Sequence, residues 1–311
     1  MRTVPLGRTG VMVSAFGFGM AHIGSRIDEP ASFRLLDQYA EAGGSFFDTA
    51  NIYATWVPGC CGGESETTLG RWMKSRGNRD GLFVCTKLGF AMPGIERGLR
   101  AAQIEAECEK SLRRLGTDRI DLYYAHVDDR ETPLAETLAA FDRLVGAGKV
   151  RFIGASNYMA WRLEEAAWVS ATRGFAQYCC VQQHYSYIRG RNPNPNYEAT
   201  PDLLDYCRVK GLALVAYSPL LGGAYASQEA LAAKQLVGPE IDARLAALRE
   251  VARTRGATPN QVVLAWLAAQ PGPVIPLIAA GSAEHLAEDL AASEIALSDA
   301  ETVRLNEAAS A

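Results

Sequence analysis

Residues 120–156 read IDLYYAHVDDRETPLAETLAAFDRLVGAGKVRFIGAS and predict a strand, a helix and a second strand. The runs IDLYYAH and VRFIGAS at the two ends are short and rich in β-branched and aromatic residues. The middle has Thr132 where an N-cap is expected, Pro133 as first helical residue and Glu136 close to capping-box spacing. This order is typical of a βαβ unit, in which both strands are parallel.

The same alternation of short apolar runs and helical patterns extends along the chain. Such runs occur at 15–19, 45–49, 82–87, 120–126, 150–156, 178–183, 212–218 and 273–278. Eight units favour a closed (β/α)8 TIM barrel over an open doubly wound sheet. Residues 3–15 predict an N-terminal β-hairpin before the first barrel strand. Because no linker or repeat interrupts the pattern, we expect a single domain over 1–311.

Helical periodicity predicts where the intervening helices lie. The segment 101–116 places apolar and small residues on one face: Ile104, Cys108, Ser111, Leu112 and Leu115. Two further helices, over 200–211 and 258–272, begin with the same Thr-Pro pair as the helix after residue 131.

Composition excludes several classes of function. The net charge is −4, without the clustered basic excess of a nucleic-acid-binding protein. No apolar run is long enough to span a membrane, and the N-terminus lacks the apolar core of a signal peptide. The seven cysteines lack C-x-x-C spacing, which argues against a metal site and predicts free thiols in a reducing cytoplasm.

Polar residues follow three of the predicted strands. Asp48 follows SFF, Lys87 follows LFVCT and His126 follows IDLYYA, while Tyr53 lies in the loop after Asp48. Singly, these residues are more often caps, solvated charges or packing groups. Together they would lie at the C-terminal rim of a barrel, where active sites of this fold are found. A lysine ammonium stabilises a tyrosine anion, an aspartate keeps the lysine charged, and a neutral histidine orients a substrate oxygen.

Around these residues the sequence resembles the aldo-keto reductase superfamily over almost its whole length. The resemblance lies in the segments FDTANIY, GGESETTLG, TKLG, LYYAHVDD, IGASNY, VQQHYSY and AYSPLLGG, which occur in the family's order. It implies that NADPH or NADH is the cofactor and that a carbonyl (aldehyde, ketone or sugar) and an alcohol are interconverted. His126, in place of an acid found in relatives that reduce C=C bonds, favours carbonyl chemistry.

The resemblance also implies roles for individual residues. Tyr53 is the implied general acid/base, tuned by Lys87 and Asp48, and His126 orients the carbonyl. Ser156, Asn157 and Gln182 are implied to hold the nicotinamide amide, and Tyr217 to stack on its ring. The implied pyrophosphate neighbours are Ser218, Leu220 and Gly222.

The segment 276–290 departs from the family pattern. Relatives that use NADPH carry basic residues here, whereas this chain has Ala279 to Ser282 and His285 at the matching positions. Glu288 and Asp289 take the place of a Glu-Asn pair that reads adenine. Since arginine is the usual partner of a phosphate, this predicts that NADH is accepted.

Three long loops are candidates for substrate or cofactor contacts. The insertion at 54–63 carries Trp56, which is expected either to wall the substrate pocket or to pack within its loop. The stretches 188–200 and 220–240 are candidate lids over substrate and cofactor. The implied partner is a small-molecule substrate, and a monomer and a homo-oligomer both remain open.

Alternative functions are weaker on the residues. YCRVK (206–210) has the Y-x-x-x-K spacing of short-chain dehydrogenases, but the chain lacks their glycine-rich turn after the first strand. A metal hydrolase on the same barrel is disfavoured because the four histidines show no H-x-H pair. A cofactor-binding sensor or regulatory subunit with little turnover remains the main alternative.

Overall fold

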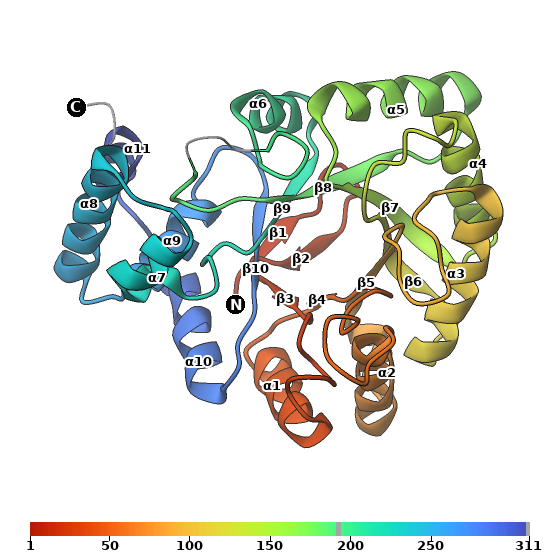
Figure 1. Cartoon of the computed structure of the whole chain (residues 1–311), viewed down its shortest axis with the longest axis horizontal. Coiled ribbons are helices and arrows are strands. Elements are labelled where there is room, and N and C mark those ends of the chain that lie inside the picture. The colour runs from red at the N-terminus through yellow and green to blue at the C-terminus, as the bar shows by residue number, and fades with distance from the viewer. Residues whose placement is uncertain (191–193, 309–311) are drawn as a thin grey trace.

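The protein is described by a computed structural model that covers residues 1–190 and 194–308 (Figure 1). The predicted single domain over 1–311 and the predicted lid over 188–200 both include a few residues outside these ranges. The remaining residues of both segments lie within the described structure.

Eight parallel strands form a closed barrel, as predicted. Their bounds agree with the predicted runs to within a few residues and are β3 Gly17–Gly19, β4 Phe46–Asp48, β5 Phe83–Leu88, β6 Ile120–Ala125, β7 Val150–Ser156, β8 Tyr178–His184, β9 Ala213–Tyr217 and β10 Val274–Ile278. Each strand pairs with its neighbour in the sequence, and β10 closes the ring on β3. The carboxyl ends of all eight strands therefore lie at one rim.

Helices surround the barrel (Figure 1). Those that follow the eight strands are α1 Glu29–Glu41, α2 Glu64–Arg76, α3 Ala101–Leu115, α4 Leu134–Gly146, α5 Ala160–Arg173, α6 Pro201–Lys210, α9 Pro259–Ala268 and α10 Ala283–Ala291. Additional helices are α7 Gln228–Ala233 and α8 Pro239–Arg255 after β9, and the C-terminal α11 Asp299–Glu307. Short 3₁₀ turns lie at Arg79–Gly81, Ala224–Ala226 and Ala292–Glu294.

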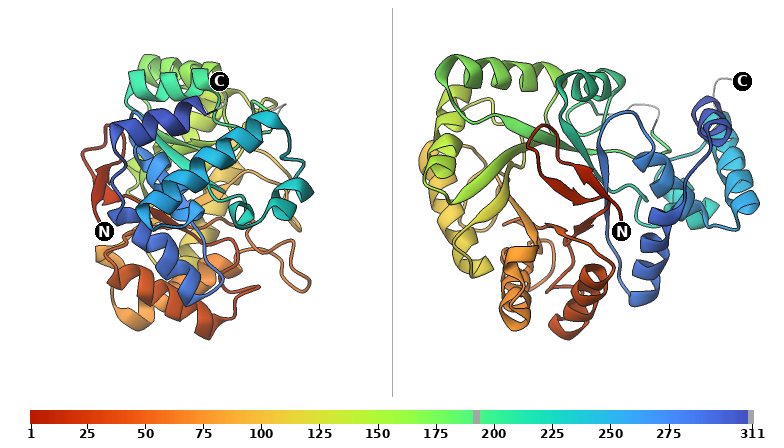
Figure 2. Two further views of the ribbon diagram at one scale, coloured as in Figure 1. Left: turned by 90° about the vertical axis from the view of Figure 1, so that its left-hand side faces the viewer. Right: turned by 180° about the vertical axis from the view of Figure 1, so that it is seen from behind.

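The predicted hairpin is present and covers the N-terminal end of the barrel. Its strands β1 Thr3–Pro5 and β2 Met12–Ser14 are antiparallel and lie across the barrel in the right-hand view of Figure 2. Leu6 and Val13 are fully buried and pack against interior residues of the barrel strands, such as Phe46 and Leu122. The hairpin therefore plugs the end opposite the catalytic rim, since apolar interior surface must be kept from water.

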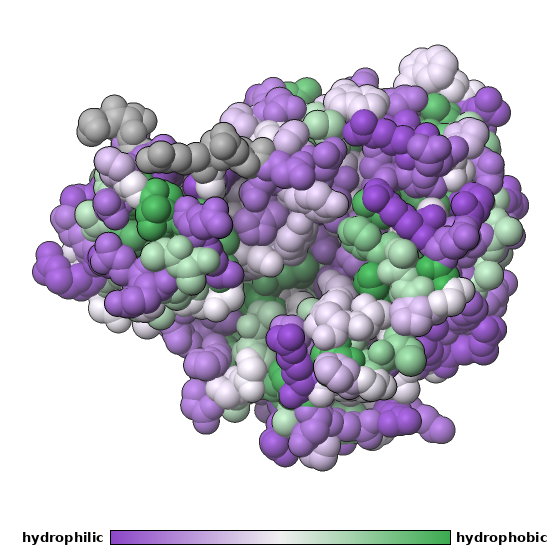
Figure 3. All heavy atoms as spheres, in the orientation of Figure 1, coloured by the Kyte–Doolittle hydropathy of each residue, from purple (hydrophilic) through white to green (hydrophobic). Residues whose placement is uncertain are grey.

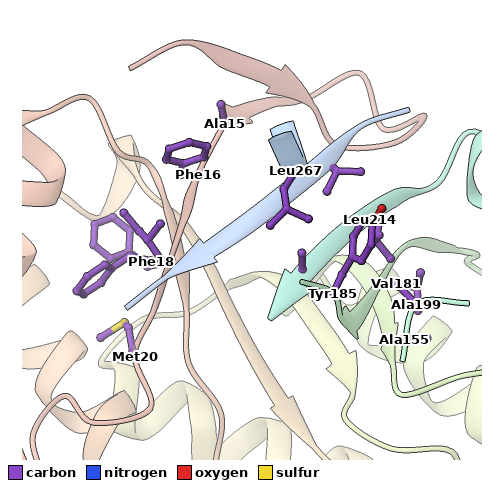
Figure 4. Close-up of a cluster of buried hydrophobic side chains, with 14 of the residues drawn as sticks. Ala15, Phe16, Phe18, Met20, Ala155, Val181, Tyr185, Ala199, Leu214 and Leu267 are labelled. Carbon is purple, nitrogen blue, oxygen red and sulfur yellow. The ribbon is translucent and has the colours of Figure 1, made fainter. Parts of the chain in front are cut away.

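The larger part of the core lies between the strands and the surrounding helices. Phe47 of β4 packs against Trp72 of α2 with ring centroids 5.3 Å apart, and Tyr123 of β6 against Phe141 of α4 at 5.6 Å. Figure 4 shows another part of this layer, in which Phe18 of β3 and Val181 of β8 contribute. Two packed layers hold each strand, so its terminal residue is fixed in position.

Helix α3 has the buried face that its periodicity predicts, whereas α4 begins later than predicted. Thr132 is not its N-cap, because the Thr132 hydroxyl donates to Asp129 and the helix begins at Leu134. Glu136 caps a different helix, since its carboxylate accepts a hydrogen bond from the backbone N–H of Ala101 at the start of α3. Across the described residues, no helix has both the length and the apolar character that crossing a membrane requires.

Candidate active site

The ends of three neighbouring strands bring the predicted catalytic residues together. Asp48 is the last residue of β4, Lys87 lies just before the end of β5, and His126 directly follows β6. Parallel pairing sets Asp48 opposite Cys85 and Lys87 opposite Tyr124, so these strand ends lie side by side. The sequence argument that placed these side chains at one rim is confirmed by the barrel.

The ammonium group of Lys87 is the centre of the site. It is fully buried and donates hydrogen bonds to the Tyr53 phenol oxygen at 2.9 Å and the Thr49 carbonyl oxygen at 2.8 Å. It also forms an ion pair with the Asp48 carboxylate, which is itself fully buried. A buried cation must be paired to be tolerated, and three oxygen acceptors satisfy all three N–H groups of this lysine.

Burial and the charge of Lys87 shift the pKa values of Tyr53 and Asp48 in opposite directions. Burial raises the pKa of Tyr53, and Lys87 opposes this without cancelling it. Burial likewise raises the pKa of Asp48 against the effect of Lys87. For Lys87, burial acts to lower the pKa, but the charges of Asp48 and Tyr53 outweigh it and raise the pKa. Tyr53 is therefore a protonated phenol held against a permanent ammonium.

His126 is neutral and has a free ring nitrogen. Burial, with a further contribution from Lys87, lowers the pKa of His126 well below its ordinary value. Its ring centroid lies 6.1 Å from that of Tyr53 and 4.8 Å from that of Phe90. Its Nδ1 atom is buried and has no hydrogen-bond partner among the residues that the structure describes. A neutral imidazole beside the phenol can hydrogen-bond a substrate oxygen.

Four residues predicted to contact nicotinamide form a hydrogen-bonded network around the catalytic group. Gln182 Nε2 donates to Asp48 Oδ2 at 2.9 Å, which positions the carboxylate that pairs with the lysine. Asn157 Nδ2 donates to the His126 carbonyl oxygen at 2.9 Å and to Ser156 Oγ at 3.2 Å. Tyr217 Oη donates to Asn157 Oδ1 at 3.0 Å. The role of Gln182 as a partner of Asp48 could not be read from the sequence.

A cleft of about 1010 Å³ begins at this network and runs along the rim. Figure 3 shows the same face of the molecule as Figure 1, hollowed near its middle and lined there by apolar residues. Of the predicted residues, those that line the cleft are Tyr53, His126, Ser156, Asn157, Gln182, Tyr217, Ser218, Leu220, Gly222, His285, Glu288 and Asp289. Catalytic and cofactor candidates from distant parts of the sequence thus share one cavity.

The cleft fits a dinucleotide in both size and chemistry. Its volume exceeds that of most drug-sized pockets, and polar residues line both of its ends. His126 Nδ1 at one end and Asn260 Oδ1 at the other lack hydrogen-bond partners within the described ranges. Near the middle, Gly222 and Gly223 have φ angles of 68° and 81°, so the backbone itself lines the wall where a phosphate would lie.

The far end of the cleft is acidic. Ser282 does not line it, because its hydroxyl caps α10 by accepting from the His285 N–H at 3.3 Å. Glu288 accepts a hydrogen bond of 2.6 Å from the hydroxyl of Thr258. Burial, followed by the charge of Glu288, raises the pKa of Asp289 to about 7. Among the described residues that line the cleft, none is lysine or arginine.

Three further side chains lie close to the site. The Trp56 ring lies 5.9 Å from that of Tyr53, but the tryptophan is exposed and is not among the described residues that line the cleft, so its role as a wall of the substrate pocket stays a prediction. His184 Nδ1 lies 2.8 Å from Glu198 Oε2, and its ring lies 5.6 Å from that of Tyr217. Trp56 was anticipated from its loop. His184 and Phe90 were not, although His184 ends β8 and Phe90 lies two residues after the end of β5.

In the part of the chain that the structure describes, no three His, Cys, Asp or Glu side chains form a group that could hold a metal ion. The seven cysteines, all within that part, are free thiols, including the adjacent pairs Cys60–Cys61 and Cys179–Cys180.

The fold and the site together define a class of enzyme, the NAD(P)-dependent oxidoreductases that reduce small-molecule carbonyls on a (β/α)8 barrel. Within this class the chain belongs to the aldo/keto reductase family, whose family model matches residues 15–310. The resemblance inferred from the sequence motifs is confirmed over nearly the whole chain.

Individual relatives support the same placement. The chain is 34% identical to "Uncharacterized oxidoreductase YrpG" of Bacillus subtilis (strain 168), over 96% of this chain and 93% of the relative. It is 31% identical to "Norsolorinic acid reductase stcV" of Emericella nidulans, over 96% of this chain and 79% of that relative. A crystal structure of the thermostable aldo-keto reductase Tm1743 with the inhibitor epalrestat matches at a TM-score of 0.79 and 32% identity, over 99% of this chain and 100% of that chain.

Proposed function

We propose that the protein interconverts a carbonyl and an alcohol with Tyr53 as general acid/base. The observation that carries this proposal is the fully buried Lys87 ammonium, which donates to the Tyr53 phenol and pairs with Asp48. A purely structural ion pair would have no need of a phenol whose hydroxyl lines a cleft.

In the reductive direction the protein moves one proton. Bound reduced nicotinamide supplies the hydride to the carbonyl carbon. Tyr53 donates its phenolic proton to the substrate oxygen, and Lys87 stabilises the phenolate that remains. His126 donates a hydrogen bond to the same oxygen from a neutral imidazole, which holds the carbonyl in place and offsets its developing charge. Asp48 keeps Lys87 charged and is itself positioned by Gln182.

The residues that would hold the cofactor follow the length of the cleft. Ser156, Asn157 and Gln182 supply the amide contacts at the nicotinamide end, where the Tyr217 ring offers a face for stacking. The segment with Ser218, Leu220 and Gly222 would contact the pyrophosphate through its backbone. His285, Glu288 and Asp289 would lie at the adenosine end, and Ser282 would act there indirectly by fixing the start of α10.

The acidic end of the cleft supports the use of NADH. A 2′-phosphate would meet Glu288 and Asp289 without a lysine or arginine among the described lining residues. Phosphate in such a site is both unpaired and close to carboxylates, whereas a ribose hydroxyl can donate to a carboxylate. A dinucleotide titration in which NADPH binds at least about tenfold more tightly than NADH would contradict this preference.

Aromatic side chains shape the substrate end. Phe90 and Tyr197 line the cleft, Phe90 with its ring against His126, and Trp56 lies near Tyr53. These rings favour an aldehyde, ketone or sugar that presents an apolar face next to its carbonyl. One relative is named a norsolorinic acid reductase, which is consistent with the reduction of a small organic molecule.

The competing function is a cofactor-binding sensor with little turnover, and one experiment separates the two. Purified protein is mixed with NADH or NADPH and a panel of aldehydes, ketones and sugars, and cofactor oxidation is followed by absorbance. We expect turnover with at least one neutral carbonyl. Cofactor binding without turnover on any member of the panel would favour the sensor.

A further inference from the structure

The segment after β8 lies between the loop after β9 and a second cleft. Ser186 and Ile188 hold the loop after β9: the Ser186 hydroxyl lies 2.7 Å from Tyr225 Oη, and the Ile188 N–H donates to the same oxygen at 2.9 Å. The alternate residues, Tyr185, Tyr187 and Arg189, line a second cleft of about 640 Å³. Alternate residues of this short segment therefore hold the loop after β9 and line the second cleft.

The second cleft is separate from the catalytic one. It lies between this segment, the start of α8, and side chains of α9 and α11, and it shares no described lining residue with the first cleft. Its floor is aromatic, because the rings of Tyr185 and Tyr187 lie 5.7 and 5.2 Å from that of Trp266. The Trp266 Nε1–H donates to Asn306 Oδ1 at 2.8 Å, which directs the Asn306 amide at the cleft.

Two arginines line this cleft above the aromatic floor. The Arg189 guanidinium lies 4.8 Å from the ring centroid of Tyr185, and that of Arg244 lies 5.5 Å from the centroid of Tyr187. Arg244 has one nearby carboxylate, Glu240 at 3.9 Å, and that side chain is mostly exposed. Arg189 has no carboxylate within ion-pair distance among the described residues. Each guanidinium group lies close to a tyrosine ring, and among the described residues neither has a carboxylate nearer than 3.9 Å, so both can pair with an anion.

We propose that the second cleft is a binding site for a small oxyanion, a carboxylate or a phosphate, held by Arg189 and Arg244. Guanidinium groups bind both kinds of oxyanion through paired N–H donors. Glu240 is the group that such an anion would displace from Arg244. The aromatic floor keeps the two side chains extended, so little conformational entropy is lost on binding.

The site is connected to the cofactor cleft through residues 218–238. Ser218, Leu220 and Gly222 at the start of this segment line the cofactor cleft, whereas Val237 and Gly238 at its end line the anion cleft. Tyr225, in the middle of residues 218–238, is hydrogen-bonded to Ser186 and Ile188 of the segment after β8. An anion bound at the end of the segment therefore also favours the arrangement in which Ser218, Leu220 and Gly222 line the cofactor cleft. This coupling rests on the proposed function, and linkage requires it to be reciprocal.

Calorimetric titration of the full chain with malonate and with inorganic phosphate, at constant ionic strength, tests the site. We expect saturable binding that weakens at least about tenfold in R189Q/R244Q, because two charge-assisted contacts are lost. R249Q, an exposed arginine of α8 outside the cleft, is the matched control and should bind as wild type does. E240Q should bind more tightly. Equal binding by wild type and R189Q/R244Q, both shown to be folded by thermal unfolding, would overturn the proposal.

A second measurement tests the coupling between the anion cleft and the cofactor cleft. The Kd of NADH, measured by the fluorescence of the reduced nicotinamide, should fall a few-fold when malonate is added to wild type or R249Q, and should not change in R189Q/R244Q. A Kd that falls equally in R189Q/R244Q would place the anion in the cofactor cleft and overturn the proposal. Failure of NADH to bind any variant, with malonate binding intact, would refute the proposed function and leave the anion site standing.

Discussion

Lys87 Nζ donates a hydrogen bond of 2.9 Å to the phenol oxygen of Tyr53, and no part of the lysine side chain is exposed. This contact connects the candidate proton donor to a charge that cannot move away. The pair Lys87–Asp48 fixes that charge inside the barrel rim. Stability and catalysis are therefore predicted to depend on the same three residues.

Lys87→Met should impair both properties. The substitution leaves the Asp48 carboxylate buried without its cation, and breaking such a pair typically lowers the free energy of unfolding by about 3–5 kcal/mol. Turnover should fall by about 10²–10⁴-fold, the range for general acid–base assistance. Urea unfolding and steady-state rates measure the two effects. K87M/D48N should recover part of the stability but none of the activity. If K87M is as stable as wild type, Asp48 has another partner for its charge.

Asp289→Asn should change how stability depends on pH. The pKa of Asp289 is raised to about 7 in the folded protein, from an ordinary value of 3.8. Between these values the folded state binds more protons than the unfolded state, so wild-type stability decreases as the pH rises from about 4 to about 7. The asparagine variant lacks this loss and should be more stable than wild type above pH 7, by on the order of 4 kcal/mol.

Urea unfolding at pH 5 and pH 8 measures this difference. Asp118→Asn, at a side chain that is 91% exposed, is the matched control and should show the same pH dependence as wild type. An identical pH dependence of D289N and wild type would mean that Asp289 titrates normally.

His285→Arg should shift cofactor preference toward NADPH. His285 lines the end of the cleft that lacks lysine and arginine among its described residues, in the first turn of α10. A guanidinium there would pair with a 2′-phosphate and should tighten NADPH binding about tenfold, with little change for NADH. Fluorescence titrations with both dinucleotides test this. Equal tightening for both cofactors would place the 2′ position elsewhere.

Much of the fold could be predicted because the sequence patterns that mark the strands and helices are local. Each barrel strand is a short apolar run, and parallel pairing then puts strand-end residues such as Asp48 and Lys87 at one rim. The predicted start of α4 was wrong because the Thr132 hydroxyl donates a hydrogen bond to Asp129, a residue outside the capping pattern. A tertiary contact of this kind leaves no mark on the periodicity.

The rest of the site depends on contacts between distant residues. Gln182 and Asp48 are 134 positions apart, and only the closed barrel brings the amide to the carboxylate. The balance between burial and the charge of Lys87, which together set the pKa of Tyr53, could not be predicted from the sequence either. The predicted effect of Lys87 has the right direction, but the depth at which the phenol is buried decides the net shift of its pKa. Burial is a property of the folded chain.

The most direct test of the account is Tyr53→Phe, with turnover and NADH affinity measured on the same preparation. The substitution removes only the hydroxyl that contacts Lys87, at a side chain that is partly exposed. The account predicts that turnover on the best carbonyl of the panel falls by at least about 10²-fold, the scale of a lost general acid, while the Kd of NADH stays within about twofold. Turnover close to that of wild type, with cofactor binding intact, would contradict the assignment of Tyr53 as the proton donor.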